Sequence, residues 1–218
     1  YKTKMLKDTL NILGWHTKRK LVIIESDDWG SVRMPSREVF YNLIENGIDL
    51  FSDGGLRYNK NDSLATESDL SALFEVLASF KDHTGRSPSF TPVSVVANPD
   101  FDSIEKSGFA QYIYEPFTQT LKKYKGCENS FSLWIEGIEK RLFVPQFHGR
   151  EHLNIPVWIR ALQNGNKNVR LAFENRMWGI STTDDPLIRI ELQAAFDFID
   201  VNDIEYQKEV ISDGLNLF

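Results

Sequence analysis

The chain has little sulfur and no long hydrophobic run. Cys127 is the only cysteine among 218 residues, so no disulfide can form within the chain and nothing indicates an oxidising compartment. The amino-terminal residues lack the apolar core of a signal peptide, and no apolar run approaches the roughly 20 residues that span a bilayer. The sequence therefore argues against a membrane span and favours a cytoplasmic location, while leaving export open.

Positive charge is also scarce. Lysine and arginine total 25 against 31 acidic residues, which gives a net charge of −6. Such a balance provides no long-range attraction to polyanions, and the basic cluster within residues 2–20 is better explained as a solvated flank. We therefore expect no nucleic-acid partner.

What the chain does contain is enough apolar material for one α/β domain, and we treat residues 1–218 as that domain. Apolar periodicity and capping residues predict strands and helices that alternate. The expected strands cover 20–25, 90–97, 143–147 and 176–181, and the expected helices cover 3–13, 35–47, 66–85, 131–142, 154–165, 185–199 and 203–217. Residues 51–63 are predicted to form an exposed loop, and residues 100–128 an insertion with short helical pieces. Crossovers of these lengths predict a parallel sheet.

Two groups of metal-binding residue types follow predicted strands. Asp27 and Asp28 come at the end of the first strand, while His148 ends the third and His152 lies four residues further on. Because the carboxyl ends of parallel strands lie at one edge of a sheet, we expect these side chains to lie close together. Carboxylate oxygens and imidazole nitrogens are usual ligands of divalent metals, so the sequence favours a metal-dependent hydrolase.

Each group alone also has a structural explanation. Adjacent aspartates are common in an acidic chain, and Asp184 and Asp185 are a second such pair that we interpret as a helix cap. The two histidines could instead be surface or hydrogen-bonded residues around a helix start, although their four-residue spacing favours a metal-ligand role. Their shared position at the ends of predicted strands is stronger evidence for a metal site than either motif alone.

The same motifs carry a family resemblance. The segment Glu25-Ser26-Asp27-Asp28-Trp29-Gly30 resembles the Thr-Phe-Asp-Asp-Gly motif of the polysaccharide deacetylase superfamily, carbohydrate esterase family 4, with Trp29 inserted. The segment His148-Gly149-Arg150-Glu151-His152 is similar to that family's His-(Ser/Thr)-x-x-His motif. The resemblance spans about residues 18–165. It implies a parallel-strand (β/α) barrel of seven strands and removal of acetyl groups from an N- or O-acetylated carbohydrate.

Residue by residue, the resemblance implies that Asp28, His148 and His152 bind a divalent metal, usually zinc, and that Asp27 is the general base. For the substrate we predict contacts with Trp29 and Trp178, whose rings could stack on sugars, although packing in the core is the better expectation for most such tryptophans. Arg150 and Arg176 complete the predicted substrate-binding set; Arg176 belongs to a loose match to the family's third motif.

The chain departs from the family pattern in two respects. No histidine follows His152, so the family's later general acid has no counterpart here. About four predicted strands are also too few to close a barrel. We therefore expect an incomplete barrel with its carboxyl-terminal strands missing, whose exposed sheet edge would favour self-association.

Two other function classes stay open. The run His148-x-x-Glu151-His152 also fits an inverted-zincin metallopeptidase, in which Glu151 would be the base and both histidines would lie on one continuous helix. Pro145 and Gly149 argue against such a helix. The third class is a non-catalytic carbohydrate-binding relative.

Overall fold

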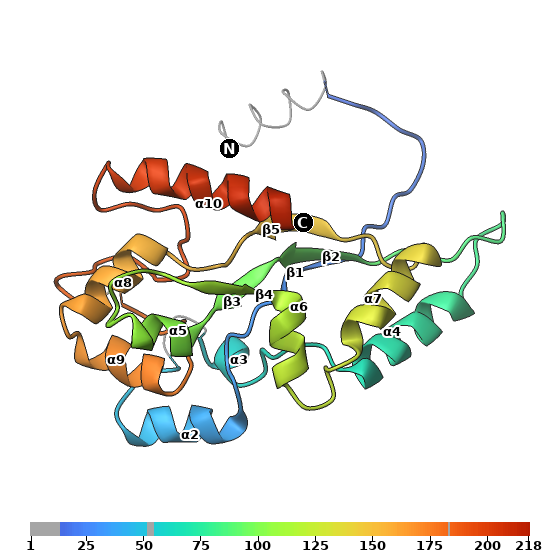
Figure 1. Cartoon of the computed structure of the whole chain (residues 1–218). Coiled ribbons are helices and arrows are strands. Elements are labelled where there is room, and N and C mark those ends of the chain that lie inside the picture. Colours follow the sequence, from blue (N-terminus) through green and yellow to red (C-terminus); the bar gives the residue numbers. More distant parts are fainter. Residues whose placement is uncertain (1–13, 52–54, 183) are drawn as a thin grey trace, which may run out of the picture.

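The computed structural model describes residues 14–51, 55–182 and 184–218 (Figure 1). The predicted helix at 3–13 lies outside these ranges. At the centre is a parallel sheet of three strands in the order β1-β2-β5. The strands are β1 (Glu25–Trp29), β2 (Thr91–Val95) and β5 (Gln146–Gly149). The expected mixed α/β fold with a parallel sheet is therefore confirmed.

The register of this sheet shifts at two places. Between β1 and β2 the shift falls between Ser26 and Trp29, and between β2 and β5 it falls at Ser94 and Val95, opposite Phe147 and Gly149. Bulges of this kind redirect side chains and are common next to functional sites. Both shifts surround residues of the predicted metal site.

The chain continues from the central strand β2 into residues 97–128, which form a separate group of short elements. It contains an antiparallel ribbon of two strands, together with α5, α6 and a short 3-10 helix, η3. Their bounds are β3 (Ala97–Pro99), β4 (Tyr114–Pro116), α5 (Phe101–Lys106), α6 (Phe117–Thr120) and η3 (Leu121–Lys123). The short helices were expected in this region, whereas the ribbon was not.

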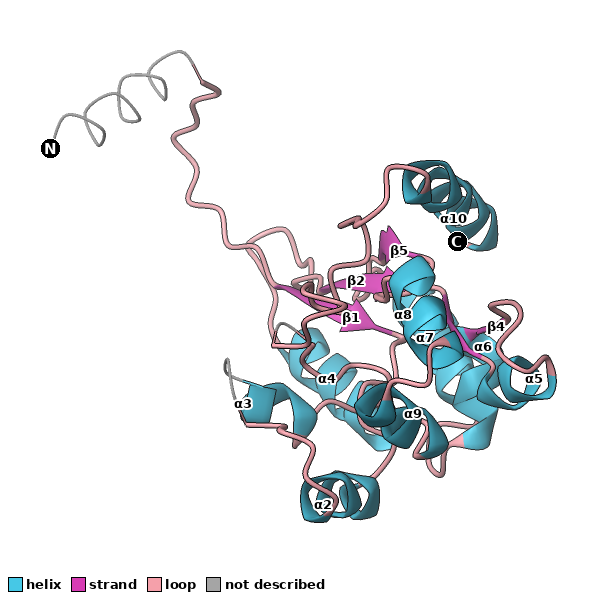
Figure 2. Ribbon diagram, turned by 90° about the vertical axis from the view of Figure 1, so that its left-hand side faces the viewer, coloured by secondary structure: helices cyan, strands magenta, loops and turns pink. Residues whose placement is uncertain are grey.

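Helices pack around the sheet in two main apolar clusters. Helices α4 and α7 pack together over one end of the sheet, with Phe74, Trp134 and Phe143 in their shared cluster. The larger cluster contains residues of α2, α8 and α9, and α10 lies beside β5 (Figure 2). The helices are α2 (Arg37–Glu45), α3 (Gly55–Asn59), α4 (Glu67–Ser79), α7 (Ser130–Glu139), α8 (Ile155–Gln163), α9 (Lys167–Glu174) and α10 (Asp203–Leu217).

The strand expected at 143–147 lies at Gln146–Gly149, and three other expected elements differ more from the structure. The first strand begins only at Glu25, and the apolar residues 21–24 before it are exposed. Residues 176–181 make no strand; Met177, Trp178 and Ile180 are buried as core side chains instead. Residues 185–199 form turns rather than a helix, because Asp185 accepts the amides of residues 187 and 188 and Arg189 adopts a φ of 60°.

Two helices lie where none was predicted. Helix α3 falls within the expected loop at 51–63, and α9 falls in a polar stretch after residue 165. Helix α9 is held by few apolar residues, among which Val169 and Phe173 are buried. Ala172 is buried as well, and Leu171 packs against the same core.

No closed barrel is formed by the described residues, whose parallel strands number three. A seven-stranded barrel is therefore not found here, and Figures 1 and 2 show an open sheet. None of the described helices has the length and apolar character needed to cross a membrane.

Candidate metal centre

The end of β1 is shaped by an unusual backbone at Asp28. Its φ is 60°, a left-handed conformation that costs a non-glycine residue of order 1 kcal/mol. The turn is closed by the Ser31 amide, which donates to the Asp28 carbonyl at 3.1 Å. Gly30 follows with a φ of 87°, and a Cβ there would lie 2.6 Å from the Val95 carbonyl oxygen. The glycine of the motif is therefore required by close backbone packing against β2.

The histidines lie at either end of a short connection between β5 and α8. His148 is within β5, and Asn154 caps α8 by accepting the Val157 amide at 3.3 Å. The connection is fixed to the sheet because the carbonyl of Arg150 accepts the amides of Val96 and Ala97, at 3.0 and 2.7 Å. This path places His152 back beside His148, with ring centroids 5.2 Å apart.

Asp28 meets both histidines. Its Oδ1 lies 3.3 Å from Nε2 of His148 and 3.6 Å from Nε2 of His152. One ligand atom from each of the three residues falls within 4.8 Å of the others, a cluster of the size that holds a metal ion. The predicted convergence of these residues is therefore confirmed, while metal binding itself stays a prediction.

The donor set fits a metal ion by a second criterion. Oδ1 of Asp28 and Nε2 of His148 are buried atoms that make no hydrogen bond within the described structure, despite their proximity. Burying polar atoms without partners is costly, and such groups call for an explanation. A divalent cation between them would satisfy both atoms.

Arg33 contacts the opposite side of the Asp28 carboxylate. Its Nη2 donates to Asp28 Oδ2 at 3.2 Å, and its Nε lies 3.4 Å from Asp62 Oδ2. The guanidinium also lies over the Tyr58 ring, 5.2 Å from the centroid. Burial raises the pKa of Asp62, an effect that Arg33 opposes and that Asp28 and Asp27 reinforce. One oxygen of Asp28 is thus occupied by Arg33, and the other faces the histidines.

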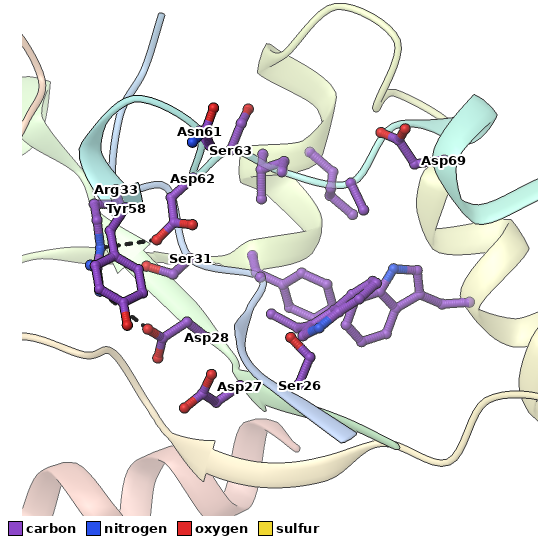
Figure 3. A pocket seen from close by; sticks show the side chains of 17 residues that line it. Ser26, Asp27, Asp28, Ser31, Arg33, Tyr58, Asn61, Asp62, Ser63 and Asp69 are labelled. Carbon is purple, nitrogen blue, oxygen red and sulfur yellow. Dashed lines mark hydrogen bonds and ion pairs between the residues drawn. The ribbon is translucent and has the colours of Figure 1, made fainter. Parts of the chain in front are cut away.

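Asp27 stands beside this cluster and is exposed. It lines two cavities, of about 450 and 390 Å³, which share Asp27, Asp28, Arg33 and Tyr58 in their walls. Figure 3 shows the first cavity, with Asp27 next to Asp28 at the end of β1. His152 lines the second. A molecule in either cavity would therefore lie next to both the metal cluster and a carboxylate outside it.

Two predicted sugar platforms are core residues. Trp29 borders the first cavity, but its ring packs against Phe90 and Phe143, each with centroids 5.3 Å away, and against Trp134 at 6.0 Å. Trp178 is only 2% exposed and belongs to the larger apolar cluster. A ring covered by protein cannot stack on a sugar, so the structure argues against that role for Trp178. Trp29 is partly buried, and part of it borders the first cavity.

The two predicted substrate-binding arginines lie elsewhere. Arg150 is buried and pairs with Glu151 and Asp213, and it is not among the residues that line the two cavities at Asp28. Arg176 pairs with Asp102 at 2.5 Å and lines a separate cavity of about 210 Å³. Neither position supports contact with a molecule bound beside Asp27.

Several residues that lie around Asp28 and the two cavities were not predicted from the sequence. Arg33 donates to the outer oxygen of Asp28, and Asp62 and Tyr58 in turn contact Arg33. Glu191 and Gln193 line the second cavity. The sequence offered one indication, the position of Arg33. It follows Asp28 by five residues, and a chain that turns at Gly30 can bring the two side chains within hydrogen-bonding distance.

Comparison with known proteins adds no relative. No family model, no curated protein and no solved structure matches the chain.

Proposed function

We propose that this chain belongs to a metal-dependent hydrolase that removes acetyl groups from an acetylated carbohydrate. The observation that carries the proposal is the cluster of Asp28, His148 and His152 with an unligated carboxylate, Asp27, beside it at a cavity. Asp28, His148 and His152 are the proposed ligands and Asp27 the proposed general base.

Three protein ligands suit a catalytic site. Two imidazoles and one carboxylate would leave an open position on zinc, which accepts these ligands and is the metal implied by the resemblance to polysaccharide deacetylases. When bound, the ion would supply polarisation of the acetyl carbonyl and a lowered pKa for water at that position. Arg33 would keep Asp28 Oδ2 occupied, so that Oδ1 is the oxygen presented to the ion.

Asp27 is suited to accept a proton. It is next in the chain to a ligand but lies outside the cluster of ligand atoms, and it is exposed at both cavities. A carboxylate in such a position can take the proton of an attacking water, a role that contributes typically about 10²–10⁴-fold to rate.

The carbohydrate substrate rests on the resemblance to polysaccharide deacetylases and on the polar walls of the cavities. Hydroxyl and carboxylate groups such as Ser26, Ser31 and Asp62 line the larger cavity, as sugar hydroxyls require. The seven-stranded barrel is part of the same proposal, with β1, β2 and β5 as neighbouring parallel strands of it.

The structure does not favour the peptidase alternative. That mechanism requires one helix through residues 140–160, whereas β5, a connection and the start of α8 occupy this range. Glu151, which would be its base, is 4% exposed and accepts hydrogen bonds from Arg150 Nε.

The test is acetate release from acetylated sugar polymers by the zinc-loaded protein. Asp27→Asn should lower the rate by about 10²–10⁴-fold and leave zinc affinity unchanged. Asp184→Asn, in the other Asp–Asp pair, is the matched control and should behave like wild type. An active wild type with an equally active Asp27→Asn variant would remove Asp27 from the mechanism. A zinc-loaded wild type that releases no acetate from N- or O-acetylated polymers would contradict the proposed activity.

A further inference from the structure

We propose that the carboxyl-terminal helix α10 is a positioning element for the metal ligands, acting through Asp213 and Gly214 on Arg150. This inference rests on the metal centre of the proposed function. Helix α10 contributes no ligand to that centre. It lies along β5, the strand that carries His148 (Figure 1).

Asp213 holds the side chain between the two histidines. Its Oδ2 accepts Nη1 of Arg150 at 2.8 Å and the Tyr114 hydroxyl at 2.6 Å. Arg150 in turn donates from Nε to both oxygens of Glu151, at 3.0 and 2.7 Å, and its guanidinium lies 4.3 Å from the Tyr114 ring centroid. The side chains of Arg150 and Glu151 are only 7% and 2% exposed, whereas that of Asp213, at the edge of this charged network, is 40% exposed. Loss of Asp213 would leave the buried Arg150 guanidinium with one charged partner fewer.

Gly214 brings the helix backbone against the same residue. A Cβ built on Gly214 would lie 2.9 Å from the backbone nitrogen and Cβ of Arg150, and 2.9 Å from the Phe147 ring. Real Cβ atoms are essentially never found so close to backbone. The absence of a side chain at Gly214 therefore allows α10 to pack against Phe147 and Arg150, on either side of His148 in the chain.

The ligand connection is thereby held from two sides. On the sheet side, the Arg150 carbonyl accepts the amides of Val96 and Ala97. On the helix side, Asp213 and Gly214 hold its side chain and backbone. Because His148 and His152 are each two residues from Arg150, a shift of residue 150 would move both imidazoles relative to Asp28. Replacing residues that orient metal ligands without binding the metal themselves commonly lowers metal affinity by about 10–100-fold.

The same helix supplies a matched control. Asp203, near its beginning, accepts Nη1 and Nη2 of Arg160 on α8, both at 2.7 Å. Asp203 is thus a buried, arginine-paired aspartate on α10 that does not contact the ligand connection. Its replacement tests the general effect of loosening the helix.

The experiment compares wild type, Asp213→Asn, Gly214→Ala and Asp203→Asn in the full chain, with folding verified by circular dichroism. Cobalt(II) is the probe, because its visible absorption reports ligand geometry and its titration gives an affinity. We expect Asp213→Asn to bind cobalt about 10-fold or more weakly with an altered spectrum, and Asp203→Asn to match wild type. If Gly214→Ala does not fold, the cobalt affinities and spectra of the two aspartate variants still test whether α10 positions the ligands.

Three results would overturn the inference. Asp213→Asn with wild-type affinity and spectrum would show that α10 does not position the ligands. Equal weakening by Asp203→Asn would assign the effect to helix stability. A folded wild type that binds neither cobalt nor zinc would overturn the metal centre itself, an outcome visible before any variant is compared.

Discussion

Arg33 donates to one carboxylate oxygen of Asp28 at 3.2 Å, while the other oxygen lies 3.3 Å from Nε2 of His148. The arginine thus fixes the orientation of the carboxylate. It also compensates part of the negative charge that Asp28 and Asp62 bring together. We therefore expect the proposed metal centre to depend on this side chain as well as on its three ligands.

We predict that Arg33→Met weakens zinc binding by about 10-fold or more, because Asp28 loses the partner that directs Oδ1 to the histidines. A competitive titration against a chromophoric chelator measures the affinity. Arg57→Met is the control: both guanidinium groups lie 5.2 Å from the Tyr58 ring centroid, but Arg57 is exposed and is not paired with Asp28. Equal affinities for the two variants would show that Arg33 does not orient Asp28.

Zinc should stabilise the folded chain through the histidines. At a free concentration 100 times the dissociation constant, a ligand that binds only the folded state adds about 2.7 kcal/mol to the free energy of unfolding. His148→Ala should abolish this gain, whereas His83→Ala, at an exposed turn, should retain it. Thermal melts with and without zinc provide the measurement. A gain that survives in His148→Ala would locate the ion elsewhere.

Trp29 should behave as a core residue. Its ring contacts Phe90, Trp134 and Phe143, so Trp29→Ala should lower the free energy of unfolding by about 3–5 kcal/mol in urea titrations. Trp15→Ala, at a position 79% exposed, should change it by less than about 0.5 kcal/mol. Near-wild-type stability for Trp29→Ala, with weaker binding of sugar polymers, would restore the sugar-platform role.

Asp203 should contribute acid sensitivity. Hydrogen bonds from Arg160 lower the pKa of Asp203 below its ordinary value of 3.8. The unfolded chain therefore takes up the proton first as the pH falls, so the stabilisation is complete above pH 3.8 and is lost as the pH falls through the folded-state pKa.

Asp203→Asn lacks this titration, so its stability deficit relative to wild type should be constant above about pH 5 and should shrink between about pH 5 and pH 3. Chemical unfolding at a series of pH values measures the deficit. A deficit that stays constant over this range would mean that Asp203 does not titrate differently in the two states.

Local rules were sufficient for several elements. Ser36 accepts the Val39 amide at the start of α2, and Thr66 and Asp69 form the capping box of α4, a pair whose three-residue spacing can be recognised in the sequence. The meeting of Asp28 with His148 was also predictable, because it follows from the direction of parallel strands rather than from side-chain detail.

Other features depend on contacts that no local pattern specifies. The periodicity of residues 185–199 suited a helix, but Asp185 used its side chain to cap a turn instead. Trp178 is a residue type that often stacks on sugars, so the sequence suggested that role. Only the tertiary packing shows that its ring is covered by protein. Likewise, Asp62 and Arg33 are separated by 29 positions, so their pairing required the tertiary structure.

The central claim is that Asp28, His148 and His152 hold one metal ion. Crystals grown with zinc, measured on both sides of the zinc absorption edge, test it most directly. We predict one anomalous peak about 2.0–2.2 Å from a carboxylate oxygen of Asp28 and from one nitrogen of each histidine. A well-folded protein at saturating zinc with no peak there, or with its peak at other residues, would contradict the account.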